Sequence, residues 1–168
     1  MRIFSIAALI AGSLIPFGAA MAAEEDFLKS IEGNWTGGGK VLRKLGGENV
    51  NVSCNMKSEA EASSFSMDGS CRALVVVTRG FKAKVNTSGN SYSGTYVGVS
   101  GKPSTLAGSR EGNTINLDVT WANEIYGDRK ATMIIQKVGE TGLLIKTVDK
   151  DPSSGKPIVT TELDLKRR

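Results

Sequence analysis

Histidine is absent from this 168-residue sequence, and its absence removes several kinds of active site. A Ser-His-Asp or Cys-His nucleophile, a His-ligated zinc and a His-ligated haem iron all require an imidazole. Two cysteines cannot by themselves supply a four-ligand cysteine metal site. We therefore expect no catalytic residue, no metal and no cofactor, and a protein that is not an enzyme.

Proline is scarce at 4 residues, whereas glycine is abundant at 20. Many turns with few prolines are typical of a protein of short strands. The formal net charge is only +4, and apart from Lys166–Arg168 the basic residues are scattered, so we expect no nucleic-acid partner. The hydrophobic fraction of 40% and the chain length fit one folded domain.

The first 22 residues have the pattern of a secretory signal peptide. Arg2 precedes an apolar run from Ile6 to Phe17, and Ala20–Ala22 fits the small-residue cleavage rule. The run is shorter than the about 20 residues that a membrane helix needs. We predict cleavage after Ala22, export to the periplasm, and a single domain over residues 23–168 with no membrane span. An uncleaved membrane anchor is the alternative.

The remaining sequence predicts an all-β protein. After a short helix at Asp26–Glu32, apolar and polar residues alternate, most cleanly in Ile115–Trp121. Turn signals such as Asn86–Asn90 and Glu111–Asn113 separate the runs at hairpin length. We predict an antiparallel up-and-down barrel of about 8–10 strands, because closure removes exposed strand edges. An open β-sandwich is the alternative.

The two cysteines are expected to form a disulfide, because a lone pair in an oxidising compartment usually does. Pairing Cys54 with Cys71 in an antiparallel hairpin also pairs Met56 with Gly69, and it keeps the apolar residues of both strands on one face. Two separate signals thus predict the same register.

The start of the domain resembles the calycin families. Gly33-Asn34-Trp35 after a short helix is similar to the G-x-W start of lipocalins, fatty-acid-binding proteins, avidins, nitrobindin-like proteins and Inh-type bacterial metalloprotease inhibitors. Trp35–Gly39 also resembles the W-x-G-x-G of the nitrobindin-like group. The resemblance implies that a basic residue of the last strand covers the Trp35 ring. Arg167 lies on the same face of the last strand as its apolar residues, so it is the candidate for this contact. The alternative is that Arg167 is a solvated charge at the end of the chain.

Alternating large residues predict a ligand-binding interior. Tyr92, Tyr96, Trp121 and Met133 would line a cavity for an apolar or amphipathic molecule, unless they only fill a core. Arg129 could hold a ligand carboxylate, or lie on a solvated hairpin rim.

The leading hypothesis is a non-enzymatic periplasmic barrel that binds a small apolar or amphipathic ligand. The alternative is a protein-binding module, such as a periplasmic protease inhibitor or a partner of another cell-envelope protein. Inh-type inhibitors insert the segment before the barrel into a protease, and Ala23–Asp26 occupies that place here. An enzyme that uses Asp, Glu, Lys or Tyr is a third hypothesis, with no residue spacing that calls for it.

Overall fold

The computed structural model describes residues 17–74 and 76–168, with side chains from residue 21 onward, so most of the predicted signal peptide lies outside the described residues. Within them a helix precedes ten strands. The elements are α1 (Phe17–Ile31), β1 (Gly33–Leu42), β2 (Asn49–Glu61), β3 (Ser64–Ala73), β4 (Val77–Ser88), β5 (Ser91–Val97), β6 (Pro103–Glu111), β7 (Thr114–Ile125), β8 (Asp128–Val138), β9 (Gly142–Lys150) and β10 (Pro157–Arg167).

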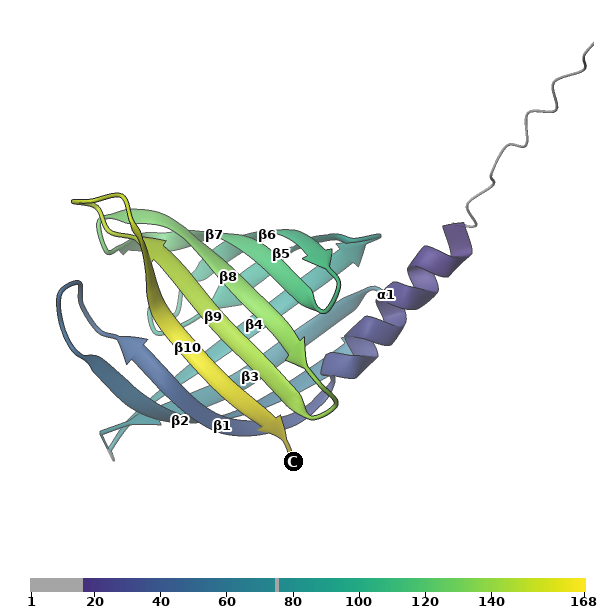
Figure 1. Ribbon diagram of the computed structural model, residues 1–168, viewed down its shortest axis with the longest axis horizontal. Coiled ribbons are helices and arrows are strands. Elements are labelled where there is room, and N and C mark those ends of the chain that lie inside the picture. The colour runs from purple at the N-terminus through teal and green to yellow at the C-terminus, as the bar shows by residue number, and fades with distance from the viewer. Residues whose placement is uncertain (1–16, 75) are drawn as a thin grey trace, which may run out of the picture.

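Each strand pairs antiparallel with its neighbours in sequence, and β1 also pairs with β10 (Figure 1). The sheet is therefore a closed barrel, which confirms the predicted all-β fold and excludes the open sandwich. The period-two pattern places one buried face along each strand, as in β7 from Ile115 to Trp121, and these faces form the inside of the barrel.

Inward-facing glycines let neighbouring strands approach each other closely. A Cβ atom on Gly39 would lie 1.8 Å from the Glu162 carbonyl oxygen of β10, and one on Gly94 would lie 2.1 Å from the Lys84 carbonyl oxygen of β4. Both glycines are thus required where the barrel wall bends.

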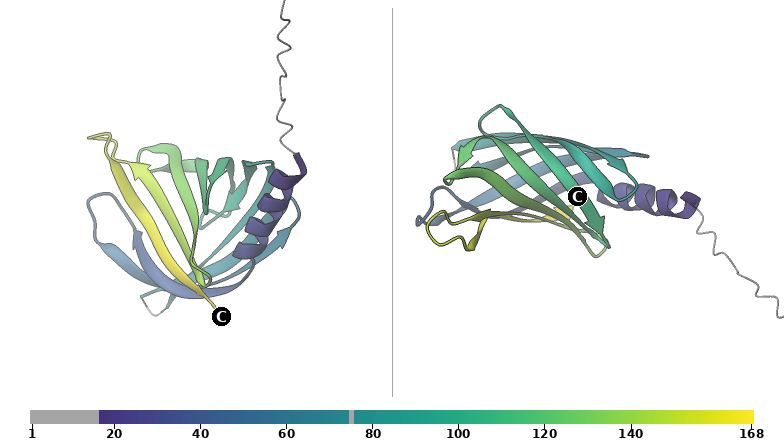
Figure 2. Two further views of the ribbon diagram at one scale, coloured as in Figure 1. Left: turned by 45° about the vertical axis from the view of Figure 1, so that its right-hand side comes forward. Right: turned by 90° about the horizontal axis from the view of Figure 1, so that it is seen from above.

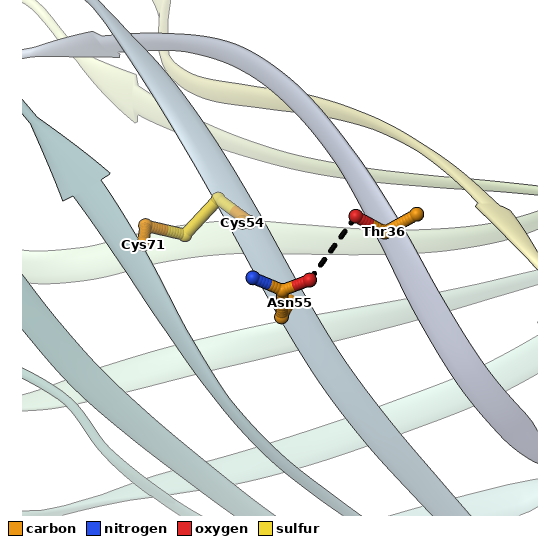
Figure 3. The surroundings of a disulfide bond; sticks show 4 residues. All are labelled: Thr36, Cys54, Asn55 and Cys71. Carbon is orange, nitrogen blue, oxygen red and sulfur yellow. Dashed lines mark hydrogen bonds between the residues drawn. A yellow bond between two sulfur atoms is a disulfide. The ribbon is translucent and has the colours of Figure 1, made fainter. Parts of the chain in front are cut away.

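The predicted disulfide and its register are confirmed. Cys54 on β2 is directly opposite Cys71 on β3, and Met56 is opposite Gly69. The bridge lies on the inner face of the barrel, where Cys54 is buried. Figure 3 shows it beside the hydrogen bond that Thr36 on β1 donates to Asn55 on β2.

The helix is longer than predicted, since it begins at Phe17 instead of Asp26 and ends at Ile31. The alanine-rich segment before Asp26 has high helix propensity and simply continues the turn of the following residues. Met21–Ala23 is exposed, and Glu24 is the first buried residue, directly after the predicted cleavage site. No described helix is long and apolar enough to cross a membrane.

The two ends of the barrel differ. The C-terminal part of α1 packs at one end, while its N-terminal part extends away from the barrel (Figures 1 and 2). Its Leu28 and Ile31 are fully buried beside Trp35, and with the side chains of Phe65 and Leu117 they belong to the solid core of this half. We call this the closed end. The end that carries the β3–β4 and β5–β6 turns is the open end.

Candidate functional site

The open half of the barrel contains a cavity of about 470 Å³. Its wall is mainly aliphatic and aromatic, with contributions from Val52, Met67, Ala83, Val85, Tyr96, Leu106, Trp121, Met133, Ile135, Ile145 and Leu163. The barrel is thus solid at the closed end and hollow at the open end. The predicted cavity and the alternative of a filled core each describe one half of the interior.

Three of the predicted ligand-binding residues meet at this cavity. Tyr96, Trp121 and Met133 all line it, and the rings of Tyr96 and Trp121 pack edge to face with centroids 5.9 Å apart. Such a pair is rigid and presents a defined apolar surface. These residues come from β5, β7 and β8, and the pairing of neighbouring strands places them on one inward face of the sheet.

Arg129 lies on the rim rather than in the cavity wall. The ladder between β7 and β8 is interrupted after Thr120, and the Nε of Arg129 donates a hydrogen bond of 2.7 Å to the Trp121 carbonyl oxygen. On the other side of β7, beyond its last pair with β6, the Ser104 hydroxyl accepts the Ala122 N–H at 3.0 Å. The exposed Arg129 therefore fixes the backbone that carries Trp121.

A buried carboxyl group lies next to the cavity wall. Asp149 is 3% exposed and accepts hydrogen bonds from the Thr160 hydroxyl and, at 3.5 Å, from the Trp121 Nε1–H. Burial raises the pKa of Asp149, and these two bonds oppose the rise. No salt bridge to Asp149 occurs among the described residues. Thr160 and Trp121 themselves line the cavity, so this group borders the site.

Tyr126 narrows the open end. It occupies the two-residue β7–β8 turn with Gly127, and both have positive φ, 54° and 98°, as a primed hairpin turn requires. Its hydroxyl donates a hydrogen bond to the Leu42 carbonyl oxygen at the end of β1. Because Tyr126 also lines the cavity, it ties the rim together directly beside the entrance.

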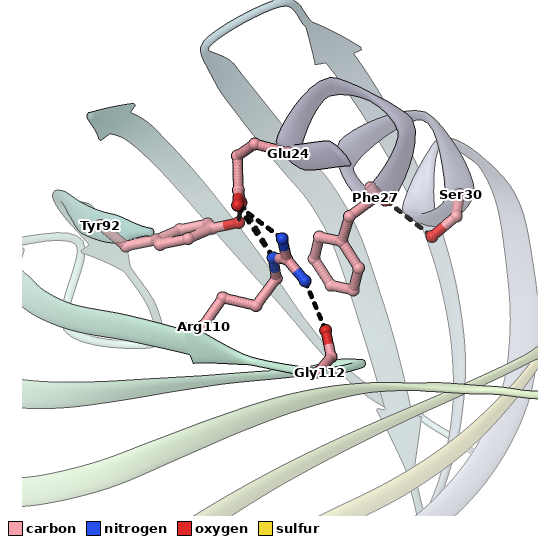
Figure 4. Close-up of polar contacts among 6 residues, drawn as sticks. All are labelled: Glu24, Phe27, Ser30, Tyr92, Arg110 and Gly112. Carbon is pink, nitrogen blue, oxygen red and sulfur yellow. Dashed lines mark hydrogen bonds and ion pairs between the residues drawn. The ribbon is translucent and has the colours of Figure 1, made fainter. Parts of the chain in front are cut away.

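Tyr92 lies in the other half of the barrel. Its hydroxyl donates to the Glu24 carboxylate of α1, and Arg110 donates to the same carboxylate, with Nη2 at 2.7 Å (Figure 4). The Arg110 guanidinium also lies 4.6 Å from the Phe27 ring centroid. Burial and the neighbouring Glu24 raise the pKa of Tyr92. Tyr92 therefore holds the helix on the barrel and does not line the cavity.

Arg167 lies over Trp35 at the closed end, with its guanidinium carbon 4.7 Å from the ring centroid. It also donates to the carbonyl oxygens of Ser30 and Glu32, and the Trp35 indole N–H donates to that of Ile31 at 3.1 Å. These carbonyls at the end of α1 have no partner within the helix. The strand residues therefore cap the helix as well as close the barrel.

Several residues of both ends were not found from the sequence. Asp149 lies on the same inward face of β9 as Leu143 and Ile145, so the alternation of this strand could have identified Asp149 as a buried residue. Nothing local links Glu24 to Tyr92 and Arg110, because these residues meet only in the folded barrel. Within the described residues no group of three or more Cys, Asp or Glu side chains could hold a metal ion.

Comparison with solved structures shows the same fold in proteins of little sequence similarity. Rv2717c from M. tuberculosis matches with a TM-score of 0.66 over 93% of this chain and 99% of its own, at 13% identity. The S-type phycobiliprotein lyase CPES from Guillardia theta matches with a TM-score of 0.55 over 86% and 92%, also at 13% identity. No family model and no curated protein matches the sequence. These likenesses support the antiparallel barrel fold alone.

Proposed function

We propose that this protein binds one small apolar or amphipathic molecule in the open half of its barrel, without chemical change, in the periplasm. The cavity of about 470 Å³ is the observation that carries the proposal. Small-molecule sites are typically concave, mostly apolar and about 300–1,000 Å³ in volume. An apolar hollow of this size, beside a solid core in the same barrel, is suited to a ligand.

The distribution of polar groups indicates how the molecule would lie. The deep wall is formed by side chains such as Val85, Ile135 and Leu163, whereas Ser104, Thr160 and the buried Asp149 lie toward the rim. An amphipathic ligand would place its apolar part deep and its hydrogen-bonding part near the rim, because a buried polar group without a partner is costly.

The closed end favours this function over protease inhibition by the N-terminal segment. An inhibitor of that kind needs an extended segment before the barrel. Here Ala23–Asp26 is helical, and Glu24 is bound by Tyr92 and Arg110. A protease could take up this segment only after a buried ion pair had been broken, which opposes binding.

Native mass spectrometry of the protein purified from its own host tests the proposal. A Phe at Ala83 would project its ring into the cavity and obstruct it, whereas a Phe at Lys84 on the same strand would point outward and serves as the matched control. We expect a bound non-protein mass in the wild type and in Lys84→Phe, and its loss in Ala83→Phe. An empty wild-type barrel, or retention of the mass in Ala83→Phe, would contradict ligand binding in this cavity.

The same sample tests the two remaining parts of the proposal. An intact mass that begins at Ala23 is expected if the predicted cleavage and export occur, and a mass that begins at Met1 would contradict them. Because one structural neighbour is named a lyase, the released ligand should also be re-incubated with the protein. An unchanged ligand mass is expected, and a new product would show that the protein is an enzyme.

A further inference from the structure

One continuous part of the sequence carries no acidic residue. Between Asp68 and Glu111 there are 42 residues without Asp or Glu, and six of them are basic. This segment forms the second half of β3 together with β4, β5 and nearly all of β6, which are neighbours in the barrel. Lys82 pairs with Asp68 and Arg110 with Glu24, and the other four basic residues form no salt bridge with a described residue. This side of the barrel wall therefore has an excess of positive charge, although the whole chain has a net charge of only +4.

The same side has exposed apolar residues at the open end. Among the described residues, six large apolar side chains of the barrel are exposed, and four of these lie on the β3–β4 and β5–β6 turns or next to them. They are Leu74, Val76, Val77 and Val99, with Val76 83% and Val99 77% exposed. We call these four residues the apolar rim.

Basic residues surround the apolar rim. Arg72 and Arg79 are exposed on the strands that flank the β3–β4 turn, and Lys102 is exposed after the β5–β6 turn. None of the three forms a salt bridge with a described residue. Val77 and Val99 also line the cavity, which places the rim at its entrance.

We propose that the apolar rim docks this protein on an anionic phospholipid bilayer. Apolar side chains on turn tips can enter the headgroup region, while neighbouring cations are attracted to anionic lipid by about 1 kcal/mol each, or about fivefold in affinity. The acid-free segment favours an anionic bilayer over a second copy of the chain, because two such surfaces repel each other. The docked barrel faces the bilayer with its cavity entrance.

Vesicle flotation tests this docking with protein purified from the periplasm, its intact mass recorded so that all variants share one N-terminus. The probes are vesicles of phosphatidylcholine alone and vesicles that also contain phosphatidylglycerol. We expect binding to the anionic vesicles, weaker binding to the neutral ones, and loss of binding as salt is raised. No binding to anionic vesicles, or equal binding to both kinds, would overturn the proposal.

Two sets of variants locate the docking surface. The triple variant Leu74→Ser, Val76→Ser, Val99→Ser should bind anionic vesicles about tenfold more weakly. Its control, Val138→Ser with Val159→Ser, removes exposed valines elsewhere and should change binding less than about twofold. Equal losses in the rim and control variants would overturn the assignment, as would a wild-type dimer that the rim substitutions dissociate.

The charged residues provide the second comparison. Arg72→Gln, Arg79→Gln, Lys102→Gln should weaken binding by about a hundredfold in low salt, if each cation contributes about fivefold. The control Lys57→Gln, Lys166→Gln, Arg168→Gln removes the same charge from the other end and should have a much smaller effect. An effect of the same size would mean that net charge alone drives binding. Docking needs no ligand in the cavity, so its failure is distinguishable from an empty barrel.

Discussion

The closed and open ends of this barrel use the same kinds of residue for different purposes. At the closed end, Glu24 is paired with Arg110, and the Trp35 ring is covered by Arg167. At the open end, Trp121 and Tyr96 border the cavity. Among the described residues, the buried Asp149 has no cation as a salt-bridge partner and the exposed Arg79 has no acid. The charged groups thus have oppositely charged or aromatic partners at the closed end, whereas Asp149 and Arg79 at the open end form no salt bridge with a described residue.

This difference indicates which residues stabilise the fold and which residues bind a ligand. The closed end combines a solid core, a capped helix and a buried ion pair, so its residues determine the free energy of unfolding. The open end has fewer internal contacts, because the cavity replaces packed side chains. We therefore expect substitutions at the closed end to change stability, and substitutions at the open end to change binding with little change in stability.

The largest effect is expected for Trp35→Ala. Loss of a fully buried indole, its bond to the Ile31 carbonyl and its contact with Arg167 should lower the free energy of unfolding by about 3–5 kcal/mol. Arg167→Ala should cost less, about 1–2 kcal/mol, since the Trp35 ring would stay packed. Denaturant unfolding measures both, and unchanged midpoints in both variants would disprove the account of the closed end.

The next effect concerns the buried ion pair. Glu24→Gln should lower the free energy of unfolding by about 3 kcal/mol, because it leaves the Arg110 guanidinium without its counter-charge in a mostly buried position. A double-mutant cycle with Arg110→Met should give a coupling energy well above that of an exposed pair such as Lys82–Asp68. Additive losses would show that the contact does not hold the helix.

A smaller effect on the free energy of unfolding is expected when a larger side chain is placed in either half of the barrel interior. Leu117→Phe in the solid half should cost about 1–3 kcal/mol, because Leu117 is fully buried in the core and does not line the cavity. Ala83→Phe in the hollow half should cost less than about 1 kcal/mol, since the cavity can take the ring. Thermal unfolding of both variants compares the two ends directly, and equal costs would mean that the open half is as densely packed as the closed half.

The smallest effect is a pH dependence at the open end. Burial raises the pKa of Asp149, so the native state keeps this proton at pH values where the unfolded chain has released it. Stability therefore falls as the pH rises from the ordinary pKa of 3.8 through the raised value. Asp149→Asn should remove this fall and raise the Tm at neutral pH by about 2–4 °C. A lower Tm at neutral pH would indicate that the charged carboxylate is stabilising.

Local patterns in the sequence were sufficient for most of the fold. The alternation of apolar residues and the turn signals predict a barrel of about 8–10 strands, and the structure has ten. The pairing of Cys54 with Cys71 follows from the same period of two. The helix was underestimated because its first half coincides with the predicted signal peptide.

The site was harder to predict, because its residues come from separate strands and meet only in the folded sheet. Parity identified Tyr96, Trp121 and Met133 as inward, but it could not show which half of the interior is hollow, and Tyr92 has the same parity in the solid half. Arg129 was expected either to face a ligand or to lie on the rim, and only the interrupted β7–β8 ladder decides its position. The partners of Glu24 are separated from it by more than sixty residues of sequence.

The most direct test of the central claim is a ligand count for variants of each end. Native mass spectrometry of wild type, Ala83→Phe and Glu24→Gln, each purified from the host, gives the number of bound molecules per chain. We predict one molecule in the wild type and in Glu24→Gln, and none in Ala83→Phe. An empty wild type, or a ligand that remains in Ala83→Phe but is lost in Glu24→Gln, would contradict the assignment of binding to the open end.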